Sequence, residues 1–378
     1  MAFFRQVRVQ DNVVDASLRD GVLVLGGAPR PGEPVYEGGL LTPPLAEPHV
    51  HLDATLLGER RPNQSGTLRE GIANWAALRP ELTGDDVIAR ARSTIARYRA
   101  YGCTRIRTHV DTGCPVAVEA LISLRATLRD EGTTLQIVAF PQEGIFRAPG
   151  RREAWEWAVA AGCDAVGAIP HFERTTEEGW ASVRLAFDLA EKHGLLLDFH
   201  CDETDDPGTR NLEVVCAEAI DRGVGGRVVA GHCTALHSYS NPYAAKVVEL
   251  VATSGVQVVA NPLDNVVLQG RYDSYPRRRG MTRVDALWAA GATVGIGHDS
   301  VQDPWYPLGT ANLVDAAYML VHVGQLMSRA EMTRAVRTLW TENHLPFGGA
   351  PPPCVWWPVA DEVALLRERP MPTLLAPG

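Results

Sequence analysis

Lysine is almost absent from this 378-residue chain. Of its 36 lysine and arginine residues, only Lys192 and Lys246 are lysines. The formal net charge is -9, and the one basic run is Arg277-Arg278-Arg279. An acidic chain without a larger basic cluster argues against nucleic acid or an anionic membrane surface as a partner. The arginine triplet is more typical of a solvated loop or of a contact between subunits.

Long hydrophobic runs are missing as well. No stretch of about eighteen apolar residues, the length that a membrane span requires, occurs anywhere in the chain. Residues 1–6 lead into a polar segment rather than into the apolar core of a signal peptide. These absences predict a soluble, cytoplasmic protein without a membrane partner.

The seven cysteines are an odd number and include no Cys-x-x-Cys pair. This pattern favours reduced, partly buried thiols over a framework of disulfides. The missing pair also excludes the zinc signature of the cytidine-type nucleobase deaminases.

Short apolar runs alternate with helix-like segments through most of the chain. The runs predict buried strands at residues 45–50, 104–110, 135–140, 164–169, 195–200, 227–232, 256–260 and 292–297. Helices are predicted at residues 84–101, 115–131, 151–161, 176–193, 210–222, 241–254, 282–290 and 309–327. Eight strands, each followed by a helix, predict an α/β fold of the (β/α)8 TIM-barrel type, with its active site at the C-terminal strand ends.

The two ends of the chain do not follow this alternation. Residues 5–44 resemble short strands separated by glycine and proline, and residues 350–378 are rich in proline. We expect both ends to form one small β-rich domain beside the barrel. The predicted division is residues 1–44 and 336–378 for the two parts of that domain, and residues 45–335 for the barrel.

Side chains suited to metal binding or proton transfer stand at four of the predicted strand ends. His49 and His51 close the first strand, and alternate residues of a strand point the same way, so both imidazoles can bind one ion. Such a pair alone is more often a hydrogen-bonded polar pair than a pair of ligands. His200, His232 and Asp299 end three further apolar runs. Imidazoles with one carboxylate suit Zn²⁺ or Fe²⁺, and a water at an open position of such an ion has a pKa of about 7.

Five segments together resemble the bacterial cytosine deaminase family of the metal-dependent amidohydrolase superfamily. They are Glu47-Pro48-His49-Val50-His51-Leu52-Asp53, Gln64-Ser65-Gly66-Thr67-Leu68, Phe140-Pro141-Gln142-Glu143-Gly144, His200-Cys201-Asp202-Glu203 and Asp303-Pro304-Trp305-Tyr306-Pro307-Leu308-Gly309. The similarity extends from about residue 40 to about residue 330. It implies a (β/α)8 barrel that hydrolyses an exocyclic amidine C–N bond and releases ammonia.

The resemblance assigns metal ligands and proton-transfer groups. The implied ligands of the metal are His49, His51, His200 and Asp299. Glu203 resembles the family's proton shuttle, which carries a proton from the attacking water to the ring nitrogen. His232 matches the position that orients and polarises the attacking water, and Asp299 is implied to be both ligand and base.

The resemblance also assigns the walls of the substrate pocket. Gln142 resembles an amide that reads a carbonyl and a ring nitrogen, a role suited to a group with both donor and acceptor. The backbone of Leu68 and the ring of Trp305 resemble further walls, although Trp305 is equally typical of a packed aromatic residue that closes a loop. At Ser300 the chain departs from the family, which has a second acidic residue there.

The scarcity of lysine predicts a single metal ion. Binuclear relatives bridge two metals through a carboxylated lysine at the end of strand four, whereas here that end reads Ile169-Pro170-His171. For His109 and His171 we expect hydrogen bonds to the ligands rather than ligation. We interpret three further histidines as structural: His237, His298 and His322.

Ser300 removes a charged acceptor, and Phe199, Gly231 and Cys233 also differ from the family's usual residues. We therefore predict a hydrolytic deaminase of a small N-heterocycle such as cytosine, isocytosine, creatinine or a biosynthetic analogue, assembled as a homo-oligomer. The alternative is a hydrolase of cyclic amides on the same mononuclear site. A non-catalytic metal-binding protein is disfavoured, because the ligand set and Glu203 are both complete.

Overall fold

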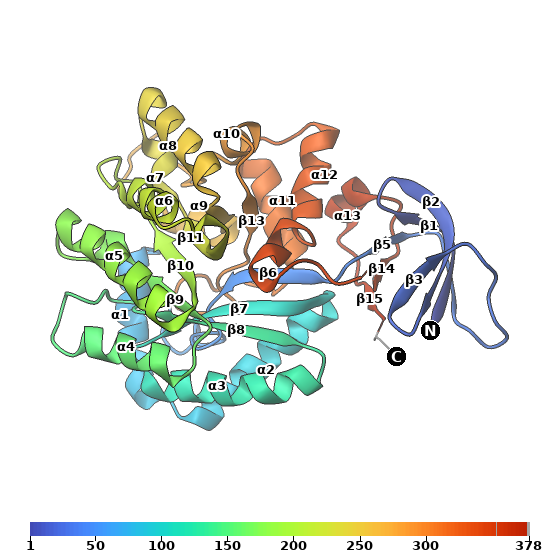
Figure 1. Ribbon diagram of the computed structural model, residues 1–378, viewed down its shortest axis with the longest axis horizontal. Coiled ribbons are helices and arrows are strands. Elements are labelled where there is room, and N and C mark those ends of the chain that lie inside the picture. Colours follow the sequence, from blue (N-terminus) through green and yellow to red (C-terminus); the bar gives the residue numbers. More distant parts are fainter. Residues whose placement is uncertain (353, 376–378) are drawn as a thin grey trace.

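The computed structural model describes residues 1–352 and 354–375 and is built around a parallel barrel (Figure 1). Eight strands lie in chain order, each parallel to the next. They are β6 (Leu45–Val50), β7 (Cys103–Asp111), β8 (Thr134–Phe140), β9 (Ala165–Ala168), β10 (Leu196–Cys201), β11 (Val228–His232), β12 (Gln257–Ala260) and β13 (Val294–Ile296). The predicted barrel is confirmed, because every strand overlaps one of the apolar runs, as expected for strands buried on both faces.

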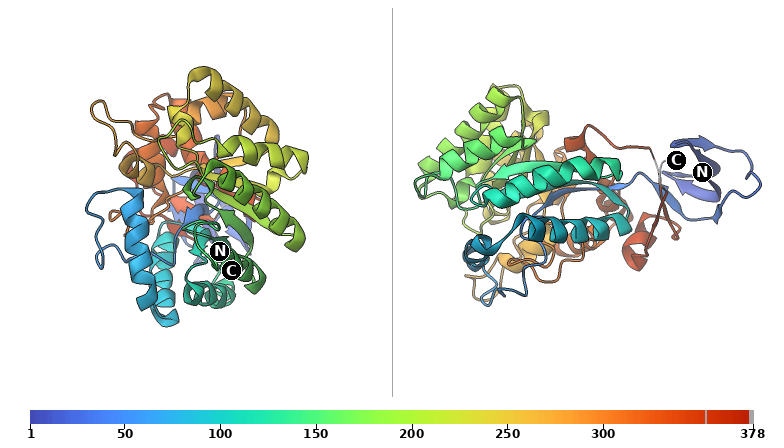
Figure 2. Two further views of the ribbon diagram at one scale, coloured as in Figure 1. Left: turned by 90° about the vertical axis from the view of Figure 1, so that its left-hand side faces the viewer. Right: turned by 90° about the horizontal axis from the view of Figure 1, so that it is seen from below.

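Helices cover the outside of the barrel (Figure 2). The predicted helices are present as α2 (Gly84–Ala100), α3 (Pro115–Asp130), α4 (Arg151–Ala161), α5 (Thr176–His193), α6 (Asn211–Asp221), α8 (Asn241–Ser254), α10 (Val284–Ala289) and α11 (Leu313–Val323). Several of them begin with an N-cap residue. At the start of α2, the hydroxyl of Thr83 accepts a hydrogen bond from the N–H of Asp86 at 3.3 Å. Three helices beyond the predicted set follow strand ends: α1 (Leu68–Leu78), α7 (Ala235–Ser238) and α9 (Pro262–Leu268). Across the described ranges, no helix is long and apolar enough to cross a lipid bilayer.

The barrel closes between its last and first strands through a few specific contacts. The N–H of Asp299 donates to the carbonyl of His49 at 2.9 Å. The side-chain amide of Asn343 donates to the carbonyls of Ala46 and Ile296, both at 2.8 Å, and accepts the N–H of Ile296 at 2.9 Å. Buried backbone groups need such partners, so this short seam is held by side chains as well as by the strand ladder.

The small sheet combines strands from both ends of the chain, as predicted. Its path runs β15-β14-β5-β1-β2-β3, with β4 paired to β1. The strands are β1 (Ala2–Val9), β2 (Asn12–Arg19), β3 (Val22–Leu25), β4 (Val35–Glu37), β5 (Leu40–Thr42), β14 (Val355–Trp357) and β15 (Thr373–Leu374). It has its own apolar cluster and lies beside the barrel end at which β6 begins (Figure 1). The sheet is therefore remote from the C-terminal strand ends.

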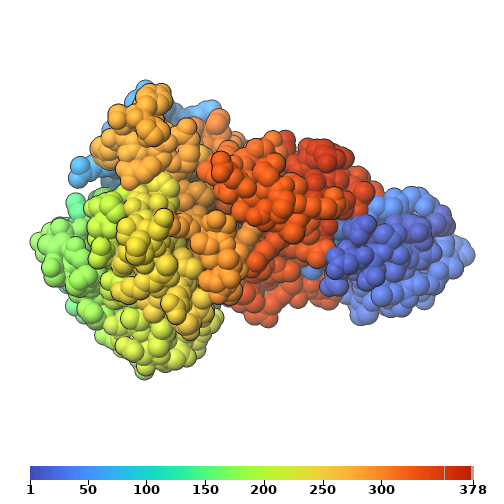
Figure 3. All heavy atoms as spheres, turned by 90° about the horizontal axis from the view of Figure 1, so that it is seen from above, coloured from blue at the N-terminus to red at the C-terminus, as the bar shows by residue number. Residues whose placement is uncertain are grey.

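Helical segments near the C-terminus connect the barrel to this sheet. Helix α12 (Arg329–Thr338), a 3₁₀ turn (Glu342–Phe347) and α13 (Glu362–Glu368) lie between the barrel and the small sheet, and Figure 3 shows them in orange and red. Helix α13 packs on α11 and α12, whereas β14 and β15 join the sheet. The division of the chain at residues 44/45 and 335/336 stays a prediction.

The interior of the barrel contains a buried ion pair below the C-terminal mouth. Arg107 on β7 donates to the carboxylate of Asp198 on β10 at 2.8 Å, and both side chains are buried. The same guanidinium donates twice to the amide oxygen of Gln136, at 3.0 and 2.9 Å. Because these partners hold one another, the ion pair forms a fixed polar floor under the strand ends.

Candidate active site

The four predicted metal ligands meet at the C-terminal mouth of the barrel. The Nε2 atoms of His51 and His200 lie 3.1 Å apart. Oδ1 of Asp299 lies 3.5 Å from Nε2 of His51 and 3.8 Å from Nε2 of His49. His49 lies on β6 and His51 directly after it, His200 on β10, and Asp299 in the segment after β13. The barrel thus brings together residues up to 250 positions apart in the chain.

The chemistry of these side chains fits a divalent ion. Both ring nitrogens of His49 and Nδ1 of His200 are buried and have no hydrogen-bond partner in the described ranges. Burial, followed by the neighbouring imidazoles, lowers the pKa of His49 and His200 well below the usual value. The rings are therefore neutral, with lone pairs available to a metal. A buried group of neutral imidazoles and one carboxyl is a metal site.

Two glycines and one aromatic ring fix the positions of the ligands. A Cβ atom at Gly231 would lie 2.9 Å from Cε1 of His49, and one at Gly297 would lie 3.0 Å from Cβ of the same histidine. Larger residues at either position would displace the ring. On the other side, Phe140 stacks on His200 with ring centroids 3.9 Å apart. The ligand geometry is therefore set by packing before any ion binds.

His109 is a further buried imidazole beside the ligands. Its ring lies 4.1 Å from that of His49, and its Nε2 lies 3.2 Å from Oδ1 of Asp198. Its donor atoms also come within 4.8 Å of those of His49 and His200, which is close enough for a shared ion. Neither ring nitrogen of His109 has a hydrogen-bond partner among the described residues, so the expected hydrogen bond to a ligand stays a prediction.

Glu203 and His232 lie on one side of the ligands. Nδ1 of His232 is 3.5 Å from Oε1 of Glu203 and 3.8 Å from Oδ2 of Asp299. Burial, and then the neighbouring carboxyl of Asp264, raises the pKa of Glu203 well above its usual value. Burial therefore favours the protonated form of this carboxyl, as a group that delivers a proton requires.

The backbone at these strand ends is left-handed. Asp202 and Cys233 have φ near 52°, His232 has 66° and Asp299 has 68°. Non-glycine residues rarely adopt this region, and each instance costs on the order of 1–2 kcal/mol. Two of these residues, His232 and Asp299, line the chamber at the mouth.

A small chamber beside the metal ligands contains all the predicted substrate-binding residues. Its volume is about 20 Å³. The lining residues are His51, Leu68, Gln142, His200, Glu203, His232, Asp264, Leu268, Asp299, Ser300 and Trp305. The buried ring of Trp305 is tilted 31° to His51, with centroids 5.8 Å apart. It also touches α1, where a Cβ atom at Gly71 would lie 2.4 Å from the ring.

Three polar residues of the chamber region were missed by the sequence analysis. Asn261, Asp264 and Asn265 follow β12 in one short segment and are buried. The amide nitrogen of Asn265 lies 3.0 Å from Nδ1 of His232. Oδ2 of Asp264 accepts a hydrogen bond from the hydroxyl of Ser300 at 2.6 Å. The available signal was their position directly after a predicted barrel strand, where functional side chains gather.

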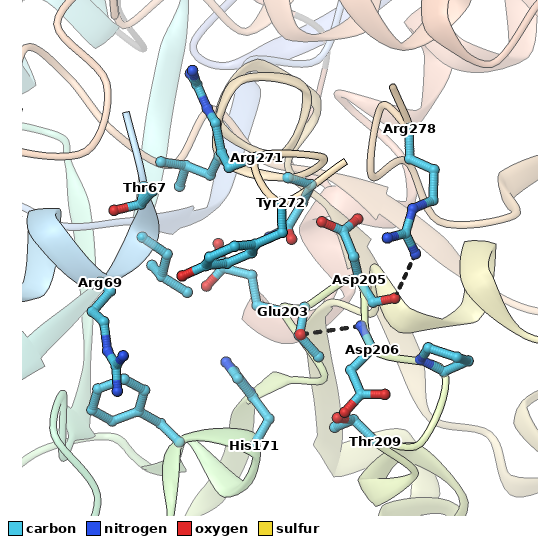
Figure 4. Close-up of a pocket in the computed structure, with 16 residues that line it drawn as sticks. Thr67, Arg69, His171, Glu203, Asp205, Asp206, Thr209, Arg271, Tyr272 and Arg278 are labelled. Carbon is cyan, nitrogen blue, oxygen red and sulfur yellow. Dashed lines mark hydrogen bonds between the residues drawn. The ribbon is translucent and has the colours of Figure 1, made fainter. Parts of the chain in front are cut away.

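A larger vestibule of about 540 Å³ leads to the chamber (Figure 4). Leu68, Glu203 and Leu268 line both spaces, so they separate the vestibule from the metal site. Figure 4 shows the ring of Tyr272 over this passage, with Arg69 and His171 on one side. The remaining charged residues of the vestibule wall are Asp205, Asp206, Arg271 and Arg278. A substrate reaches the metal ligands by passing Glu203.

A parallel barrel with a histidine and aspartate metal site at its mouth defines a metal-dependent hydrolase. A family model described as the amidohydrolase family matches residues 66–344. The chain therefore belongs to the amidohydrolase family, whose members use a bound metal to hydrolyse C–N bonds. The match begins after His49 and His51, which the structure adds to the same site.

Similar proteins of known structure or function include deaminases. The solved structure of 5-methylcytosine deaminase from Klebsiella pneumoniae with 5-fluorocytosine is 37% identical, covers 97% of this chain and 92% of its own, and has a TM-score of 0.90. Pterin deaminase from Rhizobium rhizogenes is 28% identical over 84% of this chain and 74% of its own length. N-isopropylammelide isopropylaminohydrolase from Burkholderia multivorans is 26% identical with a TM-score of 0.82, covering 98% of this chain and 95% of its own.

Proposed function

We propose that this amidohydrolase is a hydrolytic deaminase of a cytosine-like pyrimidine. The observation that carries the proposal is the position of Glu203, a buried carboxyl that lies 3.5 Å from His232 and lines the same chamber as three metal ligands. This arrangement would put one proton-transfer group within reach of both an attacking water and a bound ring. The relatives named above support the reaction class, since two of them are deaminases of N-heterocycles.

The side chains divide the reaction among them. A divalent ion bound by the ligands supplies a polarised, acidic water. Glu203 would take a proton from the attacking water and pass it to the ring nitrogen next to the amino-bearing carbon. As the water oxygen bonds to that carbon and the C–N bond breaks, Glu203 would deliver the second proton of the water to the departing ammonia. His232 and Asp299, whose Nδ1 and Oδ2 atoms lie 3.8 Å apart, would together orient the attacking water. Protonation of the ring makes the amidine carbon a better electrophile.

The walls of the chamber would hold the ring. Gln142 offers both a donor and an acceptor to a carbonyl and an adjacent ring nitrogen. Trp305 and Leu68 would enclose the flat faces, since both line the chamber. Because the chamber has a volume of only about 20 Å³, binding requires Leu68, Leu268 or Trp305 to move outward.

We further propose one ion per chain, Zn²⁺ or Fe²⁺. The end of β9, where a bridging carboxylated lysine would stand, continues into Pro170 and His171, and both lysines of the chain lie on the outer helices α5 and α8. The predicted homo-oligomer and cytoplasmic location belong to the same proposal. They are tested by light scattering and by fractionation of cells that express the protein.

The experiment that tests the function is an assay of ammonia release from a set of amino-heterocycles. Cytosine, 5-methylcytosine, isocytosine, creatinine and a pterin cover the ring sizes of interest. We expect the aminopyrimidines to give the highest kcat/KM and Glu203→Gln to give no turnover above background. Hydrolysis of a cyclic amide with ring opening and no ammonia would replace this proposal by the lactam-hydrolase alternative.

A further inference from the structure

Asp264 presents an unused carboxyl oxygen in the chamber. The side chain is 2% exposed and lines the chamber wall. Its Oδ2 accepts the hydrogen bond from Ser300, whereas its Oδ1 is buried and has no partner among residues 1–352 and 354–375. An unpaired buried acceptor is unfavourable, because it has lost its water without gaining a partner. Such an atom in a binding chamber is therefore suited to a donor on the ligand.

Ser300 cannot supply the same contact. A serine hydroxyl has one hydrogen, and here that hydrogen is donated to Asp264 at 2.6 Å. Ser300 can still accept a hydrogen bond, but its orientation is fixed by the carboxyl. The hydrogen bond also ties α9 to the segment that carries the ligand Asp299, so Asp264 is held in a defined place. Asp264 is therefore better suited than Ser300 to select the substrate.

The other polar groups of the chamber have separate tasks. Glu203 and His232 face one another, and Asp299 belongs to the metal site. Gln142 can satisfy a carbonyl and one ring nitrogen, but its single amide leaves any further N–H of an aminopyrimidine without an acceptor. Of the side chains that line the chamber, Asp264 is the carboxyl without an assigned role.

We propose that Asp264 is a specificity-determining residue whose free oxygen accepts a hydrogen bond from an N–H of the bound amino-heterocycle. This inference rests on the proposed deaminase function and adds a substrate class to it. Substrates are heterocycles that carry an N–H donor at the edge facing Asp264. Analogues methylated at that nitrogen lose the bond and leave the oxygen unpaired.

The test compares Asp264→Asn with the wild type on cytosine, 1-methylcytosine and N4,N4-dimethylcytosine, and it follows formation of the uracil product, because the last substrate releases dimethylamine rather than ammonia. The amide is isosteric, and its oxygen can still accept from Ser300, so its NH₂ group then faces the chamber as a donor. We expect kcat/KM for cytosine to fall by about ten- to a hundred-fold, because the N–H of the ring then faces a second donor and is left without an acceptor. For the analogue that lacks the N–H facing Asp264, kcat/KM of the variant should stay within about three-fold of the wild-type value.

Two variants control for structural effects. Ser300→Ala removes the partner that holds Asp264 and keeps its carboxyl, so it should lower the preference for cytosine over both methylated analogues by less than Asp264→Asn does. Asp264→Ser combined with Ser300→Asp exchanges the two groups and keeps one carboxyl in the chamber. It should be more active than Ser300→Asp alone, which sets two carboxyls in contact.

The outcome that overturns the inference is an equal loss on all three pyrimidines in Asp264→Asn. Asp264 would then be a structural support of Ser300 and α9. Failure of the deaminase proposal looks different, because the wild-type enzyme would release no ammonia from any aminopyrimidine. Metal content and circular dichroism spectra of each variant show whether the site and fold are intact.

Discussion

Glu203 is placed where a proton shuttle is needed, and a single substitution tests that role. Replacing it with glutamine keeps the shape and hydrogen-bonding capacity of the side chain but prevents proton transfer. We expect kcat to fall by about 10² to 10⁴-fold or more, because single acid-base groups contribute this much. Metal content should be unchanged, since Glu203 is not one of the ligands. A variant that keeps more than about a tenth of the wild-type rate would contradict the assignment.

Individual residues of the site differed in how well the sequence predicted them. His49, His51, His200 and Asp299 could be predicted, because they stand at strand ends within motifs, and the structure brings them together. The contact between Ser300 and Asp264 could not, because it joins positions 36 apart and depends on how α9 packs against the segment after β13. The sequence shows residue types at strand ends but not which of them pair.

At the scale of single elements, helix α1 supports the chamber through a glycine. Alanine at a helical glycine normally stabilises a protein by roughly 0.5–1 kcal/mol. At Gly71, however, the added carbon would overlap the ring of Trp305, at 2.4 Å. We expect Gly71→Ala to lower kcat/KM by about ten- to a hundred-fold, because small displacements in a binding site have effects of this size.

The matched control for this prediction is Gly84→Ala on α2. A Cβ atom at Gly84 meets nothing within 4 Å, so this variant should keep wild-type activity. Steady-state kinetics and tryptophan fluorescence of the two variants measure the difference. Equal activity in both would mean that Trp305 can move without consequence and does not position the substrate.

The barrel elements followed from hydrophobic pattern, whereas the connecting helices did not. Strands buried on both faces appear as apolar runs, and the long outer helices appear as amphipathic segments between them. Helices α1 and α9 follow polar or proline-containing segments, and their partners are far away in the sequence: α1 contacts Trp305 through Gly71, and α9 packs on α11. Local propensity alone does not reveal such contacts.

For the whole molecule, metal binding and barrel closure are coupled. Asp299 and His49 lie on opposite sides of the seam between β13 and β6, and a ligand that binds the folded state alone stabilises it. We expect the purified protein to hold close to one divalent ion per chain. Chelation should abolish activity and lower Tm. Chelation of the Glu203→Gln variant should lower its Tm by the same amount, since this variant keeps the ligands.

Elemental analysis and differential scanning calorimetry measure these two quantities. Two ions per chain would contradict the mononuclear site. A chelated protein with full activity would contradict the role of the metal altogether. An inactive chelated protein with an unchanged Tm would show that the seam is held by Asn343 and the backbone contacts without help from the ligands.

The vestibule has one consequence for the rate at which substrate arrives. Its wall carries charges of both signs, with Arg69, Arg271 and Arg278 against Asp205 and Asp206. Opposed charges at such short range leave little net field outside the opening, so an uncharged ring is neither attracted nor repelled on approach. For cytosine we expect kcat/KM to vary by less than about two-fold between 20 mM and 500 mM salt, as expected where electrostatic steering is absent. A steep dependence on ionic strength would reveal a substrate that carries charge of its own.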